Sequence, residues 1–137
     1  MSVKFRTYYM DSAVFELPVV LDKANAALPE VEFDTIVGTG FSGSIVIPAL
    51  ALIMNKRFVL IRKESDDSHH GGGLLVGDLG ERWIFVDDFI LSGRTRERVM
   101  LRVSQAAGPR ARMVGQYLYG GYTDAPTRFE PYNPDWA

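Results

Sequence analysis

The sequence predicts an α/β fold, a mostly parallel twisted sheet flanked by helices. Apolar segments typical of strands alternate with longer segments typical of helices along the chain. The central strand candidates are apolar at consecutive positions, which indicates that both faces of the sheet are covered. The 137 residues are enough for one such domain with a buried core.

The elements can be placed in order along the chain. Residues 3–10 are aromatic and β-prone, and they predict a first strand. The segment 17–28 has Pro18 near its start and its apolar residues on one face, which predicts a helix. We then expect strands at 33–37, 57–61, 82–86 and 111–119, and helices at 44–55, with Pro48 in its first turns, and at 94–107, stopped by Gly108. This divides a single domain, 1–137, into a core of about 33–119 and a small hood or arm from 1–32 and 120–137.

Composition and charge argue against several classes of protein. The net charge is −2, so no basic surface favours nucleic acid as the main partner. The most apolar window, residues 44–54, is too short to cross a bilayer, which needs ~20 residues. The chain has no cysteine, which excludes disulfides and thiolate metal sites and is compatible with a reducing compartment. We therefore expect a cytoplasmic protein without membrane or nucleic-acid partners.

The segments that follow the strands are the candidate ligand sites, because parallel α/β sheets bind ligands at the carboxyl ends of their strands. After the strand 33–37 comes GTGFSG, residues 38–43, with the G-x-G-x-x-G spacing of a dinucleotide-binding loop. Glycines in such a loop allow the backbone to approach phosphate oxygens closely. The spacing therefore predicts a diphosphate site, without saying which diphosphate.

The end of the predicted strand 82–86 has the largest number of candidate ligand-binding groups, in the segment WIFVDDFILSGRT. Asp87 and Asp88 come at the end of a buried strand, where both carboxylates can face one ligand. They suit the two hydroxyls of a ribose, or water on a divalent metal ion. Ser92, Gly93 and Thr95 follow in a short turn that opens a helix, and free N–H groups at a helix N-terminus favour phosphate. Together these features predict a ribose-5-phosphate site.

FVDDFILSGRT resembles the phosphoribosyl-pyrophosphate (PRPP) motif of type I phosphoribosyltransferases, in which a strand ends in two acidic residues before a TGGT or TGKT loop. Ser92 replaces the first Thr of that loop, and Arg94 stands where the family has Gly or Lys. The upstream segment 33–64 looks like the first βαβ unit of adenine and orotate members, with a V-G-x-x-x-R-G loop and an Arg-Lys pair. Here Val37, Gly38 and Gly43 match the loop, and Arg62 and Lys63 match the pair, whereas Ser42 stands where many members have Arg.

The resemblance implies a Mg²⁺-dependent transfer of ribose 5-phosphate from PRPP to a nitrogenous base, with release of pyrophosphate, in a homodimer. Arg62 and Lys63 would act on the pyrophosphate, and Asp87 and Asp88 on the ribose and, through water, on the metal ion. The loop 38–43 would hold pyrophosphate, with a cis peptide bond within residues 40–43. The implied co-substrate-binding residues are Gly38, Thr39, Gly40, Phe41, Ser42, Gly43, Leu91, Ser92, Gly93, Arg94 and Thr95.

Two further segments match regions to which the family gives a function. Residues 62–82 form a long connection of the kind that closes over the reacting centre, and His69 and His70 are candidates for a basic role there. A solvated loop with no role for the two histidines is the other interpretation. The segment at the end of the predicted strand 111–119 would line the base pocket, with Tyr119, Tyr122 and Asp124 as candidates. Positions in the core or in a turn explain these residues equally well.

Two alternatives to the enzyme stay open. A dinucleotide-binding domain, with Arg62 and Lys63 facing the 2′-phosphate of NADP, would explain GTGFSG but not Asp87 and Asp88. A non-catalytic protein that binds PRPP or a nucleotide on the same fold is the second alternative. Ser42 leaves room for it, because one fixed positive charge of the family's loop is missing.

Overall fold

One mixed sheet forms the centre of the molecule in the computed structural model, which describes residues 2–6, 10–62, 74–90, 92–121 and 127–136. Its strand order is β3-β2-β1-β4-β5-β6. The four inner strands are parallel, and both edge strands are antiparallel to their neighbours. The strands are β1 (Thr35–Thr39), β2 (Arg57–Ile61), β3 (Leu75–Gly77), β4 (Arg82–Asp87), β5 (Arg112–Leu118) and β6 (Arg128–Pro131). The predicted α/β class with a mostly parallel sheet is confirmed.

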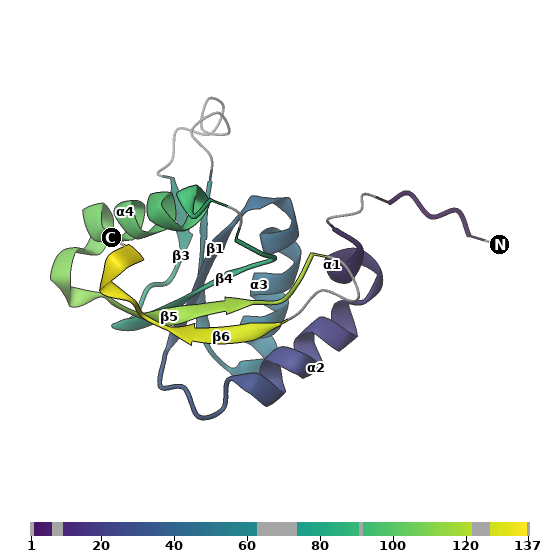
Figure 1. Ribbon diagram of the computed structural model, residues 1–137, viewed down its shortest axis with the longest axis horizontal. Coiled ribbons are helices and arrows are strands. Elements are labelled where there is room, and N and C mark those ends of the chain that lie inside the picture. The colour runs from purple at the N-terminus through teal and green to yellow at the C-terminus, as the bar shows by residue number, and fades with distance from the viewer. Residues whose placement is uncertain (1, 7–9, 63–73, 91, 122–126, 137) are drawn as a thin grey trace.

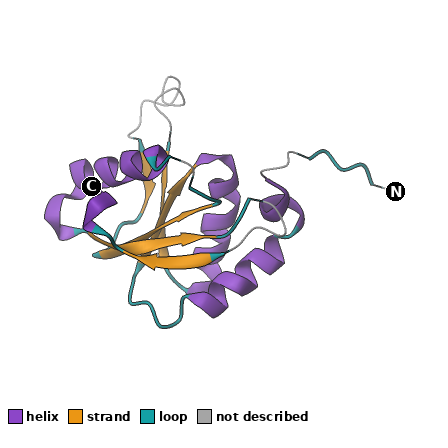
Figure 2. Ribbon diagram, viewed as in Figure 1, coloured by secondary structure: helices purple, strands orange, loops and turns teal. Residues whose placement is uncertain are grey.

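Helices cover both faces of this sheet (Figures 1 and 2). On one face lie α1 (Asp11–Phe15), α2 (Leu17–Ala27) and α3 (Gly40–Met54), and on the other lies α4 (Arg94–Ala107). Neighbouring strand residues divide between the two cores, since Ile36 and Ile84 pack with α3 whereas Val37 and Phe85 pack with α4. This explains why the inner strands are apolar at consecutive positions. Two 3₁₀ helices, Gly108–Arg110 and Pro134–Trp136, follow α4 and β6.

Several predicted elements agree closely with the structure. The helix expected at 17–28 is α2, the strand at 57–61 is β2, and the helix at 94–107 is α4. Gly108 follows α4 with a φ of 62°, a conformation that glycine adopts without strain. No helix in the described part of the chain combines the length and the apolar character that crossing a membrane requires.

The predicted strand at 3–10 is wrong where the structure describes it. Residues 2–6 have no regular structure and extend away from the body of the molecule (Figure 1), and Asp11–Phe15 form α1. A β-prone sequence forms a strand only when another strand is within hydrogen-bonding reach, and none of the described strands pairs with this segment. The sequence pattern also did not predict the edge strands β3 and β6, the short helix α1 or the two 3₁₀ helices.

The helix α3 begins at Gly40, four residues before its predicted start. Most of GTGFSG is therefore the first turn of a helix, where N–H groups have no partner within the helix and small residues are tolerated. Pro48 consequently lies inside α3 rather than in its first turns. The described residues contain no cis peptide bond, so the expectation of one within 40–43 is wrong, and the helical geometry of this segment is the reason.

Candidate functional site

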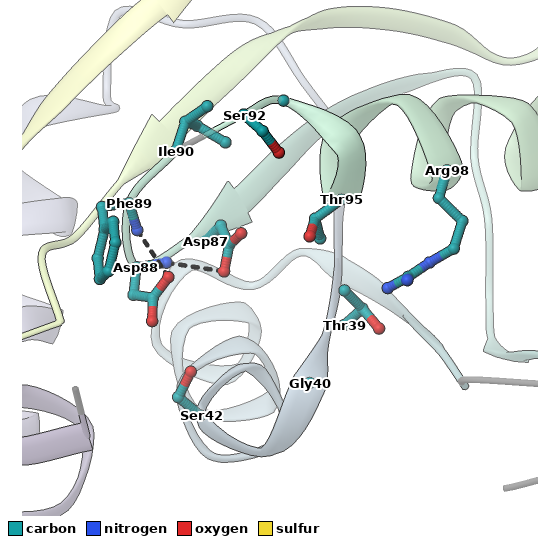
Figure 3. A pocket seen from close by; sticks show the side chains of 11 residues that line it. Thr39, Gly40, Ser42, Asp87, Asp88, Phe89, Ile90, Ser92, Thr95 and Arg98 are labelled. Atoms are coloured by element: carbon teal, nitrogen blue, oxygen red, sulfur yellow. Dashed lines mark hydrogen bonds between the residues drawn. The ribbon is translucent and has the colours of Figure 1, made fainter. Parts of the chain in front are cut away.

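A cavity of about 340 Å³ lies at the carboxyl ends of β1 and β4, between the N-termini of α3 and α4 (Figure 3). Such an edge is where parallel α/β sheets bind ligands, because the strands end together there and the helices present free N–H groups. The structure brings eight predicted residues together around it: Thr39, Gly40, Ser42, Asp87, Asp88, Ser92, Gly93 and Thr95. Segments 50 residues apart in the sequence thus share one site.

The acidic pair lies at the end of β4. Asp87 is the last residue of the strand, and Asp88 follows it in a bend. The Asp88 N–H donates to Asp87 Oδ1 at 2.9 Å, and the Phe89 N–H donates to Asp88 Oδ1 at 2.7 Å (Figure 3). Backbone N–H groups of Tyr119 and Gly120 donate to the carbonyls of Asp87 and Asp88. These bonds fix the turn, so both carboxylates line the cavity.

The two carboxylates interact strongly with one another. Burial raises the pKa of Asp87 to about 7, and the neighbouring Asp88 charge contributes in the same direction. The Asp88 N–H and the Arg98 charge oppose the rise in this pKa. A bound cation would relieve the repulsion, so the pair in the free protein is poised to accept positive charge.

The turn after this pair closes one side of the cavity. Gly93 has a φ of 82° and precedes α4, and Ser92 Oγ accepts a hydrogen bond of 3.3 Å from the Arg94 N–H. A residue with a side chain would be strained at such a φ. The turn is therefore built to bring backbone N–H groups and the hydroxyls of Ser92 and Thr95 towards one point.

The three glycines of GTGFSG have different structural roles. A Cβ on Gly38 would lie 2.8 Å from the Val86 carbonyl oxygen, so this glycine permits close packing of β1. Gly40 has a φ of 85° and lines the cavity, whereas Gly43 is buried within the first turn of α3. Only Gly40 of the three therefore faces the space that a ligand would fill.

Ser42, the position where the family's arginine is missing, is paired with Tyr119. The Tyr119 hydroxyl donates to Ser42 Oγ at 2.9 Å, and the tyrosine side chain is buried. Burial raises the pKa of Tyr119, so the phenol stays protonated at neutral pH. Tyr119 thus supports the cavity wall from behind, which differs from the predicted stacking role against a base.

The structure does not bring every predicted residue to the cavity. Phe41 is 75% exposed, and the Phe41, Arg94 and Arg62 side chains are not among the groups that line it. Thr39 does line it, but its hydroxyl donates to the Ile61 carbonyl at 2.6 Å and ties β1 to β2. Lys63, His69, His70, Leu91, Tyr122 and Asp124 lie outside the described residues.

The sequence reasoning missed three cavity residues, Phe89, Ile90 and the charged Arg98. Arg98 lies three residues after Thr95 on α4, so both side chains reach the same face of the helix and point into the cavity (Figure 3). Its Nε is buried and has no hydrogen-bond partner among the described residues. The i, i+3 spacing from Thr95 was the available signal. Arg98 gives an otherwise acidic cavity one positive group, suited to an anionic ligand.

The donor atoms at this site fit a magnesium ion that is shared with a substrate. Mg²⁺ is usually held by one or two carboxylates, with water and phosphate oxygens completing its coordination. Asp87 and Asp88 supply two such carboxylates, and because burial and the Asp88 charge raise the pKa of Asp87, a cation beside them would favour its ionised form. The described residues include no cluster of three or more metal-binding side chains, so a dedicated protein cage is not present there.

The fold and the site define the chain as an α/β protein of the kind that binds ligands at the carboxyl end of a parallel sheet. Comparison with known proteins narrows this class. The chain is 32% identical over 109 residues to adenine phosphoribosyltransferase of Bifidobacterium longum subsp. infantis, covering 67% of this chain and 56% of the relative. It is 31% identical over 96 residues to orotate phosphoribosyltransferase of Methanospirillum hungatei, covering 67% of this chain and 55% of that relative. No family model matches the chain.

Solved structures of phosphoribosyltransferases are also similar to the chain in fold. Adenine phosphoribosyltransferase of Saccharomyces cerevisiae matches with a TM-score of 0.55 and 26% identity, over 73% of this chain and 64% of that one. Leishmania donovani UMP synthase matches in fold with a TM-score of 0.62 and 19% identity, over 79% of this chain and 23% of that one. The chain is therefore related, in sequence and in fold, to the type I phosphoribosyltransferases. It spans about half the length of the curated relatives that it matches.

Proposed function

We propose that the protein is a Mg²⁺-dependent phosphoribosyltransferase, which transfers ribose 5-phosphate from PRPP to a nitrogenous base and releases pyrophosphate. The observation that carries this proposal is the meeting of Asp87 and Asp88 with the turn 92–95 around one cavity. A pair of carboxylates suits the ribose hydroxyls, and the N-terminus of α4 suits a phosphate. The relatives in sequence are phosphoribosyltransferases, which supports the same reaction.

Each part of the site has a role in this proposal. Asp87 and Asp88 orient the ribose, directly or through water on the metal ion, and the turn 92–95 binds the 5′-phosphate. The N-terminal turn of α3 and the basic pair Arg62 and Lys63 bind pyrophosphate. A base nitrogen attacks C1 of the ribose as the bond from C1 to the pyrophosphate oxygen breaks. The electron pair of that bond leaves with pyrophosphate, and the attacking nitrogen loses its proton to solvent.

Positioning and charge stabilisation supply the acceleration, and no covalent intermediate is needed. A bound magnesium ion supplies neutralisation of the charge on the pyrophosphate. Arg98 places a further positive group in the same cavity. From the resemblance to the type I family we also propose a homodimer and, with no cysteine in the chain to form disulfides, a cytoplasmic location.

A screen of nucleobases tests the reaction. The protein is incubated with Mg-PRPP and, separately, adenine, orotate and other bases, and nucleotide and pyrophosphate are measured by mass spectrometry. We expect one base to give both products in equal amounts, and the double variant Asp87→Asn/Asp88→Asn to give neither. Binding of PRPP without formation of product from any base would contradict the proposed transferase activity.

That outcome would instead favour a non-catalytic protein that binds PRPP or a nucleotide on the same fold. Ser42 is the specific observation in its favour. Its hydroxyl is hydrogen-bonded to Tyr119, and it stands where many family members have a positively charged arginine. Binding of NADPH without binding of PRPP would favour the dinucleotide alternative.

A further inference from the structure

The C-terminal segment Tyr132–Trp136 packs against the N-terminal turn of α4, the helix that opens beside the cavity. The guanidinium carbon of Arg96 lies 4.4 Å from the centre of the Trp136 ring, a cation–π contact. Tyr132 meets the same indole edge to face, with ring centres 6.0 Å apart. Trp136 also packs on the apolar cluster beneath α4. The last described residues of the chain thus cover an arginine only one position beyond Thr95.

Arg96 is held from its other side by a partly buried polar network. Its Nη1 donates to Gln116 Oε1 at 3.3 Å, and Gln116 Nε2 donates to Glu130 Oε1 at 3.2 Å. Gln116 lies in the apolar strand β5 with 2% of its surface exposed, so its amide requires these partners. Arg128 donates to the same Glu130 oxygen at 2.8 Å. The network connects the edge strand β6 to the first turn of α4.

This arrangement places the Arg96 guanidinium directly behind the turn that lines the cavity. A Cβ on Gly93 would lie 3.3 Å from Arg96 Nη2, so the cation touches the turn at its glycine. Arg96 does not line the cavity, whereas Gly93 does. Arg96 Nε is buried without a hydrogen-bond partner among the described residues. The guanidinium therefore adds positive potential to the free N–H groups of the turn, in a site where solvent screens it less than at the surface.

We propose that Trp136 and Arg96 are positioning residues for the phosphate subsite at 92–95, so that the C-terminal segment sets the affinity of this subsite for a phosphomonoester. The inference rests on the proposed function, because it takes the turn 92–95 as the 5′-phosphate subsite. It adds a role for the Pro- and aromatic-rich end of the chain, which the reaction itself does not require.

Equilibrium binding of two probes tests the inference. Ribose 5-phosphate probes the turn 92–95, and Mg-pyrophosphate probes the opposite part of the cavity. We expect Trp136→Ala and Arg96→Gln to weaken ribose 5-phosphate binding by roughly 3- to 30-fold, the range expected for one partly buried charge near a helix terminus. Pyrophosphate affinity should stay within about twofold, and Trp136→Phe should keep most of the wild-type affinity because phenylalanine also offers a ring face.

Arg110→Ala is the matched control, since Arg110 lies at the far end of α4 and its loss changes the net charge equally. Thermal unfolding of each variant checks its folding, and Arg96→Gln serves if Trp136→Ala does not fold. Wild-type affinity for ribose 5-phosphate in both variants would overturn the inference while leaving the proposed function standing. An equal loss for both probes would overturn it too, because that indicates a general structural defect. No binding of either probe to the wild type would overturn the proposed function and the inference with it.

Discussion

At the residue scale, Asp87 carries a charge that its buried position disfavours, as expected of a side chain kept for the proposed function. Its raised pKa of about 7, against 3.8 for an ordinary aspartate, means that the folded protein holds its proton more tightly than the unfolded chain. Between these two values the unfolded chain binds fewer protons, so this group makes the free energy of unfolding fall as pH rises. A ligand or cation that needs the ionised form must then displace a proton.

Asp87→Asn should therefore stabilise the free protein above pH 7. We expect a gain of roughly 2 kcal/mol at pH 8 and little change at about pH 3, where the proton is largely bound in both states. Urea unfolding of wild type and variant at the two pH values measures the difference. A variant that is less stable than wild type at pH 8 would show that the carboxylate is favourably paired in the folded state.

A second residue-scale prediction concerns the Ser42–Tyr119 pair. Ser42→Ala leaves the buried Tyr119 hydroxyl without its acceptor, which should cost about 1–3 kcal/mol of unfolding free energy. Tyr119→Phe removes the donor as well, so the double variant should be less destabilised than the sum of the two single variants. Additive losses in this double-mutant cycle would mean that the hydrogen bond contributes nothing.

At the element scale, Asp34 ties the starts of β1 and β4 together at the end of the sheet opposite the cavity. Its Oδ2 accepts hydrogen bonds from the Glu81 and Arg82 N–H groups at 3.1 and 3.0 Å, and its Oδ1 accepts one from the Thr35 hydroxyl. Burial acts to raise the pKa of Asp34, but these bonds and the charge of Arg57 together lower it below 3.8. The ionised carboxylate is therefore a structural link between two parallel strands.

Asp34→Ala should destabilise the fold by about 1–3 kcal/mol at pH 7, because two N–H groups lose a charged acceptor. Since the folded pKa is lowered, the stabilisation by Asp34 is present above pH 3.8 and lost as pH falls through the folded value. Denaturation curves between pH 3 and 7 should converge for wild type and variant at the acidic end. A constant difference across this range would contradict the role of the carboxylate charge.

The first and third glycines of GTGFSG make a matched pair of element-scale variants. Gly38→Ala should destabilise by roughly 1–3 kcal/mol, since the new Cβ would meet the Val86 carbonyl oxygen at 2.8 Å, and backbone must move. Gly43→Ala should be neutral or stabilising, because its Cβ would contact Ile47 at an ordinary 3.6 Å and alanine favours the helix. Equal effects of the two substitutions, measured by thermal unfolding, would contradict this division of roles.

The elements that the sequence predicted well are those whose burial pattern decides their structure. The strand 57–61 and the helix 94–107 have apolar residues at positions that fit their burial, and clear boundaries separate them from their neighbours. Asn55 ends the helix that precedes the strand, and Gly108 ends the helix 94–107, so local and tertiary preferences agree. β3 and β6 have only three and four residues and lie at sheet edges, where half-exposed side chains give no alternation to read. The first turn of α3 was predicted as a loop because glycine and serine are common in both.

At the scale of the whole molecule, the alternation of strands and helices was sufficient to predict a mostly parallel sheet. The carboxyl ends of its strands would then lie at one edge although they are far apart in the sequence. Asp87, Asp88, Ser92, Gly93 and Thr95 were found because their spacing after one strand carries its own chemistry. Arg98 and the Arg96–Trp136 contact were not, because they depend on which face of α4 turns towards the cavity and on where the C-terminal segment packs. No local sequence pattern encodes where the C-terminal segment packs.

The most direct test of the account is isothermal titration of the protein with PRPP in the presence of Mg²⁺, for wild type and for Asp87→Asn/Asp88→Asn. We predict binding to the wild type that requires Mg²⁺ and tightens from pH 6 to pH 8, as Asp87 loses its proton. The double variant should remain folded and lose at least about 100-fold in affinity, in line with the loss of a charge-assisted contact to both ribose hydroxyls and the metal ion. Unchanged PRPP binding by the double variant would contradict the assignment of this cavity.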